Sequence, residues 1–275
     1  MRSAFAKRVA SAALLAPAAL LAAYAGGAVF AAVVAFAAIV MCFEWARMVE
    51  GRDFSAVFYA LAAPGGGAFT LAAAGYFPYA YGLCVVGALA AGLASRARAP
   101  RGEGAGRASR WRWASFGAFY ILAPSVALLW LRGEVENGRS LCLMLFLVVW
   151  SADTGGYIGG RLVGGPKMSP AVSPAKTWAG AAGGVIMGAL AGVFAAPWIN
   201  GAGAGGFFAL AGASLGLASI LGDMAESAFK RIFGVKDASG FIPGHGGALD
   251  RLDGMIFATT AMTLALYFHM VFGRI

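Results

Sequence analysis

The sequence predicts an all-α, polytopic membrane protein with about nine transmembrane helices and a cytoplasmic N-terminus. Of its 275 residues, 60% are hydrophobic and 12% are charged, and the mean hydropathy of +0.76 lies outside the usual range of soluble domains. Long apolar runs recur along the chain, and an α-helix needs about 20 such residues to cross the hydrocarbon layer. The alternating pattern of a membrane β-barrel is absent from the sequence.

The apolar runs give the order of the expected spans. These are residues 9–24, 27–45, 55–74, 76–95, 113–131, 140–160, 178–198, 205–225 and 254–273. The first run follows Arg2, Lys7 and Arg8 and contains small residues, so a cleaved signal peptide is an alternative. The dense succession of spans behind it favours a retained helix.

The net charge of +9 raises the question of a nucleic-acid partner, which the distribution of the charges answers. With the N-terminus inside, only Arg132, Arg139 and Arg274 of the 21 basic residues lie outside, which leaves 18 on the cytoplasmic side. This asymmetry is the positive-inside rule for short loops. The excess of basic residues is therefore explained by the membrane topology, and no nucleic-acid partner is expected. The Arg-rich segment 95–113 is interpreted as a topogenic loop that could also touch anionic lipid headgroups.

The character of the chain changes along its length. Residues 1–95 are interpreted as a transmembrane scaffold, residues 96–139 as the Arg-rich loop with the fifth span, and residues 140–275 as the catalytic region. In the seventh span, glycines recur every four residues and form a stripe that lets another helix approach closely: Gly180, Gly184, Gly188 and Gly192. That seam could lie within one chain or between two subunits, so a homodimer stays possible.

The first polar cluster, WSADTGGYIGGRLVGG, begins at Trp150. Its Asp153 lies near the cytoplasmic end of a span, where an unpaired carboxylate costs about 2.5–3.5 kcal/mol. Asp153 therefore needs a cationic partner or a wet cavity. The purely structural alternative is that it pairs with Arg161 or a helix terminus.

The second cluster, GGPKMSPAVSPAKTWAG, is expected to be a short loop that ends in a helix start. Its Ser-Pro pairs hold the backbone extended. Lys167, Lys176 and Thr177 place ammonium and hydroxyl donors just before the seventh span, and the N-terminus of a helix suits phosphate groups. For Ser173 alone, a helix cap is the better interpretation.

The third cluster, LGDMAESAFKR, ends the eighth span. On a helix, Asp223 faces the same side as Glu226 and Ser227, while Glu226 and Lys230 form an i,i+4 pair. Asp223 is left without an obvious local partner. Glu226 is explained at least as well by a surface pair as by a functional role.

The fourth cluster is the loop PGHGGALDRLDG before the last span. Gly244, Gly246 and Gly247 can turn backbone N–H groups toward an anion. Asp250 and Asp253, three residues apart, fall on one helical face. Carboxylates beside a phosphate cradle suggest a metal–phosphate site that suits Mg²⁺ better than zinc. The alternative is an ordinary salt-bridged helix start formed by Asp250, Arg251 and Asp253.

The stretch SAFKRIFGVKDASGFIPGHGGALDRLD, residues 227–253, resembles the signature of the phosphatidate cytidylyltransferases. It keeps the Ser-x-x-Lys-Arg start, the Lys-Asp pair at 236–237, Pro243, the His-Gly-Gly at 245–247 and the closing Asp-Arg-Leu-Asp. ADTGGYIGGRL and SPAKTWAG are also similar to family segments, so the resemblance covers residues 150–254. Ala179 departs from it, because the family commonly has Glu or Gln there.

The resemblance implies transfer of the cytidylyl group of CTP to phosphatidic acid, giving CDP-diacylglycerol and pyrophosphate. It implies Mg²⁺ held by Asp223 and Asp250, and it leaves a second cation at this site open. The implied catalytic residues are Asp223, Asp250, Lys230 and His245. The implied substrate-binding residues are Asp153, Ser173, Lys176, Thr177, Ser227, Arg231, Lys236, Gly246, Gly247 and Arg251.

Two other functions stay open at this point. Acids inside membrane spans also mark ion-coupled transporters, although those favour midplane polar groups in two related halves. A CTP-dependent enzyme that acts on another lipid acceptor is the second alternative. The expected location is a cell inner membrane, as a multi-pass protein with its active site facing the cytoplasm, where CTP is found.

Overall fold

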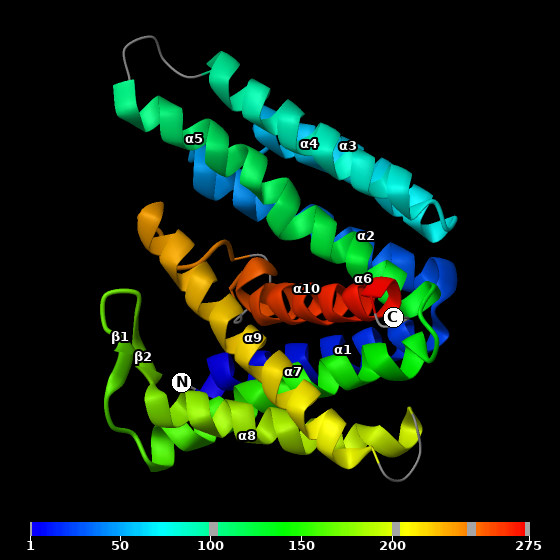
Figure 1. Cartoon of the computed structure of the whole chain (residues 1–275). Coiled ribbons are helices and arrows are strands. Elements are labelled where there is room, and N and C mark those ends of the chain that lie inside the picture. The colour runs from blue at the N-terminus through cyan, green and yellow to red at the C-terminus, as the bar shows by residue number, and fades with distance from the viewer. Residues whose placement is uncertain (1, 99–103, 200–203, 241–245, 273–275) are drawn as a thin grey trace. The chain divides into compact units, whose positions relative to one another are not determined.

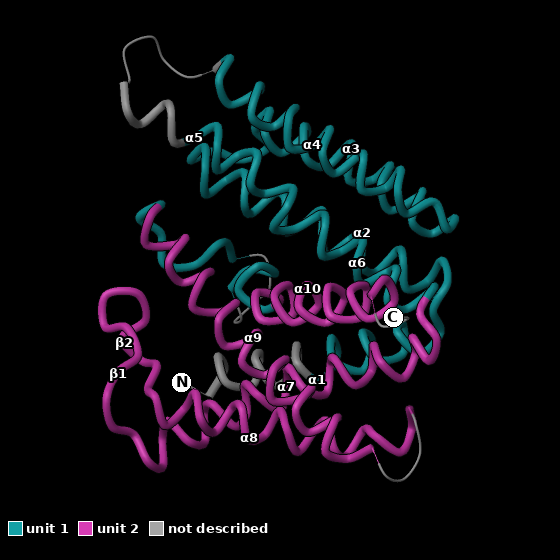
Figure 2. Tube along the Cα trace, in the orientation of Figure 1, with its two compact units in different colours: residues 1–134, 233–251 teal, residues 135–232, 252–275 magenta. Residues whose placement is uncertain are grey.

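The computed structural model describes residues 2–98, 104–199, 204–240 and 246–272, and most of them are helical. The chain divides into two compact units (Figure 2). Unit 1 contains residues 1–134 and 233–251, and unit 2 contains residues 135–232 and 252–275. The functional division of the chain at residues 95 and 139 stays a prediction.

Unit 1 is a group of apolar helices joined by short turns (Figure 1). Helix α2 packs against α3, α5 and α6, and α3 lies beside α4. Gly51, with φ +69°, ends α2 in the left-handed conformation that glycine tolerates. The elements are α1 (Arg2–Ala25), α2 (Gly27–Glu50), α3 (Ala56–Ala73), α4 (Phe77–Arg98), α5 (Gly104–Gly117), a π-helical turn (Ala118–Leu122) and α6 (Ala123–Gly133).

The Arg-rich segment is more helical than expected. Helix α4 continues to Arg98 and α5 already begins at Gly104, so the interpretation of residues 95–113 as a loop is wrong at both ends. The guanidinium carbons of Arg96 and Arg112 each lie 5.7 Å from the ring centre of Trp111. These cation–π contacts help the helices to continue beyond their apolar parts.

Unit 2 consists of helices and one small hairpin. Its elements are α7 (Gly138–Leu162), β1 (Lys167–Ser169), β2 (Ser173–Thr177), α8 (Trp178–Ala195), a 3₁₀ turn (Ala196–Trp198), α9 (Gly205–Ile232) and, from residue 252 onward, α10 (Leu249–Phe272). The strands pair antiparallel, with Ser169 opposite Ser173. The hairpin adjoins the start of α8 in Figure 1. The extended backbone expected here is confirmed, but it is paired as a sheet and not an open loop.

Eight helices among the described residues are long and apolar enough to cross a membrane. They are Gly27–Glu50, Ala56–Ala73, Phe77–Ala97, Arg110–Gly133, Gly138–Leu162, Trp178–Trp198, Gly205–Ile232 and Leu249–Phe272. The ninth expected span falls in α1, where a shorter apolar helix covers Ala13–Ala25. The prediction of a polytopic helical membrane protein is confirmed, and the part of the chain that the structure describes contains eight of the expected spans at full length.

The glycine stripe of α8 is buried within the chain. A Cβ atom on Gly188 would lie 2.7 Å from the carbonyl oxygen of Gly212 in α9, and one on Gly184 would lie 2.9 Å from that of Ala152 in α7. The seam therefore packs α8 against both neighbours of the same unit. This settles the intrachain role of the stripe, and the homodimer stays a prediction.

Candidate active site

The start of α8 positions the first group of polar side chains. Thr177 is buried at the end of β2, and its Oγ1 accepts a hydrogen bond of 3.1 Å from the Gly180 N–H. It is thus the N-cap of α8. The interpretation of Ser173 as the cap is wrong, because the backbone stays extended through Thr177.

Lys176, just before this cap, forms an ion pair with Asp223 of α9. Its Nζ lies 2.5 Å from Oδ2 of Asp223, and the two side chains are 20% and 43% exposed. Asp223, which had no obvious partner on its own helix, therefore finds one on the hairpin. The carboxylate of Asp223 is the exposed side of the pair, whereas the Nζ atom of Lys176 is buried.

Close packing of α9 and α10 brings Asp253 into the same region of unit 2. A Cβ on Gly222 would lie 2.5 Å from the carbonyl oxygen of Asp253, so only glycine allows this approach. Asp253 is nearly buried, and one of its carboxylate oxygens accepts a 2.7 Å hydrogen bond from the Gly254 N–H. Asp223, Asp153 and Lys176 lie close enough to Asp253 to interact with it electrostatically. Three helices of unit 2 thus contribute acids to one electrostatic group.

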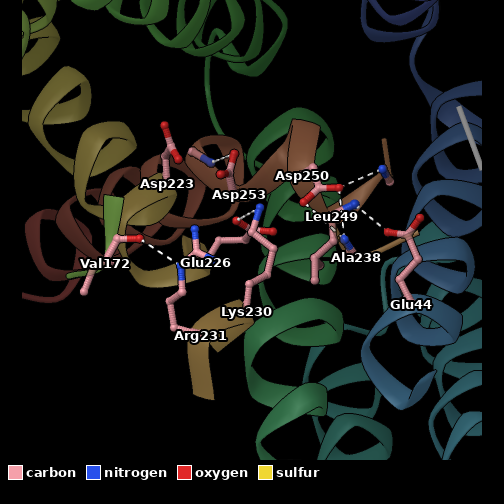
Figure 3. A network of polar contacts seen from close by, with 12 residues as sticks. Glu44, Val172, Asp223, Glu226, Lys230, Arg231, Ala238, Leu249, Asp250 and Asp253 are labelled. Atoms are coloured by element: carbon pink, nitrogen blue, oxygen red, sulfur yellow. Dashed lines mark hydrogen bonds and ion pairs between the residues drawn. The ribbon is translucent and has the colours of Figure 1, made fainter. Parts of the chain in front are cut away.

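The end of α9 carries two further cations (Figure 3). Lys230 lies 2.7 Å from the almost fully buried Glu226, which confirms the expected i,i+4 pair. Arg231 donates from Nε to the carbonyl oxygen of Val172, 3.4 Å away in the hairpin turn. Ser227 is half-buried on the same helix. Two contacts therefore join the hairpin to the end of α9: the Lys176–Asp223 ion pair and the Arg231–Val172 hydrogen bond.

The loop before α10 forms a separate group in unit 1. The carboxylate of Asp250 accepts hydrogen bonds from the N–H groups of Gly247, at 2.8 Å, and Ala238, at 3.2 Å. Gly246 has φ +84°, and a Cβ there would lie 2.9 Å from Asp250 Oδ2. The Gly247 N–H, which was expected to face an external anion, is bonded to Asp250 instead.

Three other predicted site residues belong to this loop or follow it directly. Lys236 and Arg251 are exposed. His245 lies outside the described residues, so its role stays a prediction.

Glu44 is a site residue that the sequence analysis missed. It lies in α2, is fully buried, and accepts hydrogen bonds from the Ala248 N–H at 2.9 Å and the Leu249 N–H at 2.7 Å. The interpretation of residues 1–95 as a scaffold stays a prediction, and Glu44 shows that this region contacts the predicted loop before α10. The signal was a single acid inside the apolar run MCFEWARM, because ionisable residues inside membrane spans usually have a specific role.

Comparison with known proteins decides the family. A sequence model of the cytidylyltransferase family matches residues 6–269, almost the whole chain. The chain belongs to the cytidylyltransferase family. The resemblance found in the motifs is thereby confirmed.

Relatives of this cytidylyltransferase include three proteins named phosphatidate cytidylyltransferase. That of Haemophilus influenzae is 42% identical over 163 residues, which cover 55% of both chains. That of Brucella suis is 36% identical over 152 residues, covering 55% of this chain and 56% of the relative. That of Staphylococcus saprophyticus is 37% identical over 153 residues, covering 56% and 59%. The matched part therefore spans a little over half the length of these curated relatives.

The donor set of this cytidylyltransferase fits Mg²⁺. Within the described residues, no three His, Cys, Asp or Glu side chains gather closely enough to enclose a metal ion by themselves. Mg²⁺ does not need such a cage, because it is usually held by one or two carboxylates together with water and substrate phosphates. Asp223, Asp253 and Asp153 supply hard carboxylate oxygens whose mutual repulsion a cation would relieve.

Proposed function

We propose that this chain transfers the cytidylyl group of CTP to phosphatidic acid, giving CDP-diacylglycerol and pyrophosphate. The observation that carries the proposal is the Lys176–Asp223 pair beside Asp153 and Asp253 at the ends of apolar helices in a cytidylyltransferase. Membership of this family favours an enzyme over the ion-coupled transporter that the sequence left open. The names of the relatives favour phosphatidic acid over another lipid acceptor.

Helix α9 presents apolar side chains on one face and Asp223 on another. Leu217 and Leu221 are 47% and 49% exposed, and at six and two residues before the half-exposed Asp223 they lie on a different face of the helix. Apolar side chains on a membrane helix face lipid without cost, whereas the ion pair needs water or a charged group. Phosphatidic acid has both parts, and it can enter sideways from the bilayer with its headgroup near Lys176.

The chemistry follows from the charges of the two substrates. A phosphate oxygen of the lipid attacks the α-phosphorus of CTP in line, the bond from this phosphorus to the bridging oxygen breaks, and pyrophosphate leaves. The lipid phosphate is already an anion near neutral pH, so no general base is needed. Catalysis then consists mainly of positioning and charge neutralisation.

Basic residues of unit 2 would bind the phosphates. Lys176, Lys230 and Arg231 all lie where α9 meets the hairpin. Each is already bonded to a protein oxygen, so a substrate phosphate would compete with Asp223, Glu226 or Val172. Six other residues stay predicted substrate contacts: Thr177, Ser173, Ser227, Lys236, Gly246 and Arg251.

Asp223 and Asp250 remain the proposed Mg²⁺ ligands, with Asp253 as an added candidate next to Asp223. Both carboxylate oxygens of Asp250 already accept N–H bonds, so a metal ion would share or displace these bonds. When bound, Mg²⁺ would neutralise phosphate charge, and a second cation would extend this effect. The side facing CTP is proposed to be the cytoplasmic face of a cell inner membrane, as the positive-inside rule indicates.

The test is product formation by the purified full-length protein in mixed micelles. CDP-diacylglycerol is measured after incubation with CTP and phosphatidic acid, with Mg²⁺ or with EDTA in its place. Product that depends on Mg²⁺ supports the proposal. A folded protein that makes no product with phosphatidic acid but does so with an isoprenoid-linked glycerol phosphate would replace the acceptor. Solute flux into liposomes without CTP consumption would replace the enzyme with a transporter.

A further inference from the structure

Glu44 is bonded to the loop that precedes α10, far away in the sequence but within unit 1. Its Oε1 accepts hydrogen bonds from the Ser239 hydroxyl, at 2.5 Å, and from the Ala248 N–H, and its Oε2 accepts one from the Leu249 N–H. Figure 3 shows the carboxylate facing the start of α10. Three donors on one buried carboxylate satisfy a group that would otherwise be costly to bury.

The next residue of α2 holds the other end of the same loop. Trp45 is fully buried, and its ring meets the ring of Phe233 edge-on, with 6.0 Å between centroids. Its indole N–H donates to the carbonyl oxygen of Trp113 at 2.9 Å, which fixes the orientation of the ring. Phe233 begins the loop segment of unit 1, residues 233–251, and Leu249 lies near its end. Two consecutive residues of α2 thus hold both ends of this segment.

A carboxylate suits this place for a specific reason. The first N–H groups of a helix have no intrahelical acceptor, and the helix dipole favours a negative charge there. Glu44 supplies that charge to α10 from another helix. Gly247 leaves room for it, because a Cβ on Gly247 would lie 2.7 Å from Glu44 Oε1.

We infer that Glu44 is a positioning residue for the transfer reaction. It touches no proposed substrate group itself. Through Ser239, Ala248 and Leu249 it fixes the segment that carries Lys236, Gly247 and Asp250, the groups proposed to act on the triphosphate and its metal ion. This inference rests on the proposed function.

Glu44→Gln is the first variant. One side-chain oxygen becomes an NH₂ group, so at least one of the three donors loses its acceptor while the shape is retained. The concentrations of CTP and Mg²⁺ at half-maximal rate are expected to rise roughly tenfold, and kcat to fall roughly 10- to 100-fold, since a small displacement of an active-site group has effects of this size. The KM for phosphatidic acid is expected to stay within about twofold, because its proposed site lies with Lys176.

A second readout needs no substrate or metal. Hydrogen exchange in peptides that contain residues 246–252 is expected to become roughly tenfold faster in Glu44→Gln, because the Ala248 and Leu249 amides lose part of their protection. Glu50→Gln is the matched control, since it makes the same change in α2 at a carboxylate bonded to Arg52. This control should leave both exchange and kinetics unchanged.

The outcomes are distinct. Faster exchange together with higher CTP and Mg²⁺ requirements supports the inference. Faster exchange with all three half-saturation concentrations unchanged overturns it, because Glu44 is then structural only, and unchanged exchange overturns it as well. If Glu44→Gln does not fold, Ser239→Ala, which removes one donor and keeps both backbone bonds, should give the same pattern with a change of roughly two- to fivefold. If the wild-type protein makes no CDP-diacylglycerol at all, the proposed function fails and the positioning role fails with it, whatever the exchange data show.

Discussion

Lys176 Nζ lies 2.5 Å from Asp223 Oδ2, and this pair joins the β1–β2 hairpin to α9 in unit 2. Asp223 is 43% exposed, whereas the Nζ atom of Lys176 is itself buried. An ion pair with one buried charge is costly to break, because removal of the partner leaves that charge buried without a counter-charge. The pair therefore joins the hairpin to α9 and keeps the buried ammonium next to a half-exposed carboxylate.

Asp223→Asn is expected to lower turnover by at least about 100-fold, because it removes a charge proposed to hold the metal ion and orient Lys176. The free energy of unfolding is expected to fall by about 1–3 kcal/mol, since the buried Nζ of Lys176 loses its ion-pair partner. Initial rates and thermal unfolding in detergent measure both. Asp53→Asn is the control, because Asp53 also pairs with a basic residue, Arg47, but at an exposed site. Retained activity in Asp223→Asn would remove this residue from the metal site.

Asp250→Asn is expected to abolish turnover in a protein that still folds. The amide oxygen can take the place of Oδ2, which accepts from both the Gly247 and the Ala238 N–H groups, so the loop bonds are retained and the stability is expected to change by less than about 1 kcal/mol. The rate should be measured against the Mg²⁺ concentration. If Asp250 is a metal ligand, the variant needs a different Mg²⁺ concentration for half-maximal rate. If this concentration is unchanged and only the stability falls, the role of Asp250 is limited to its hydrogen bonds with Gly247 and Ala238.

Lys230→Met is expected to destabilise the protein by about 3–5 kcal/mol, because it removes the ion-pair partner of the buried Glu226. The double variant Glu226→Gln with Lys230→Met should regain most of this stability, since no buried charge loses its partner. Activity should stay low in both variants if Lys230 binds a phosphate. Recovery of the rate in the double variant would show that Lys230 acts only through Glu226.

Gly188→Ala is expected to lower stability by about 1–3 kcal/mol, because the added methyl group would push α8 away from Gly212 of α9. Gly206→Ala, which adds the same group to α9 with no atom within 4 Å, is the control and should be neutral or stabilising. Thermal unfolding of both variants gives the comparison. Equal stabilities would mean that the helices repack without cost.

The helices were predictable because a membrane span depends on local composition. The apolar runs gave eight of the spans within a few residues. The hairpin was less predictable. Its strands have only three and five residues, which is too short for an alternation of polar and apolar residues to distinguish a strand from an extended loop. Thr177 could be recognised as a hydroxyl before a helix, but choosing it over Ser173 needed the position at which the strand ends.

The site was predictable only where its contacts are close in sequence. The Glu226–Lys230 pair followed from helical spacing. The partner of Asp223 lies 47 residues earlier in the chain, on the hairpin, so no spacing rule indicates it. Glu44 contacts Leu249 across 205 residues, and a single sequence carries no signal for that pairing beyond the cost of an acid in an apolar helix.

The fate of a phosphorus label tests the central claim most directly. Purified protein is given phosphatidic acid, Mg²⁺ and CTP labelled at either the α- or the γ-phosphorus, and the label in the lipid product is counted. Cytidylyl transfer predicts that α-label enters the lipid in a one-to-one ratio with cytidine, while γ-label leaves as pyrophosphate. Entry of γ-label into lipid without cytidine would contradict the account and indicate a CTP-dependent lipid kinase.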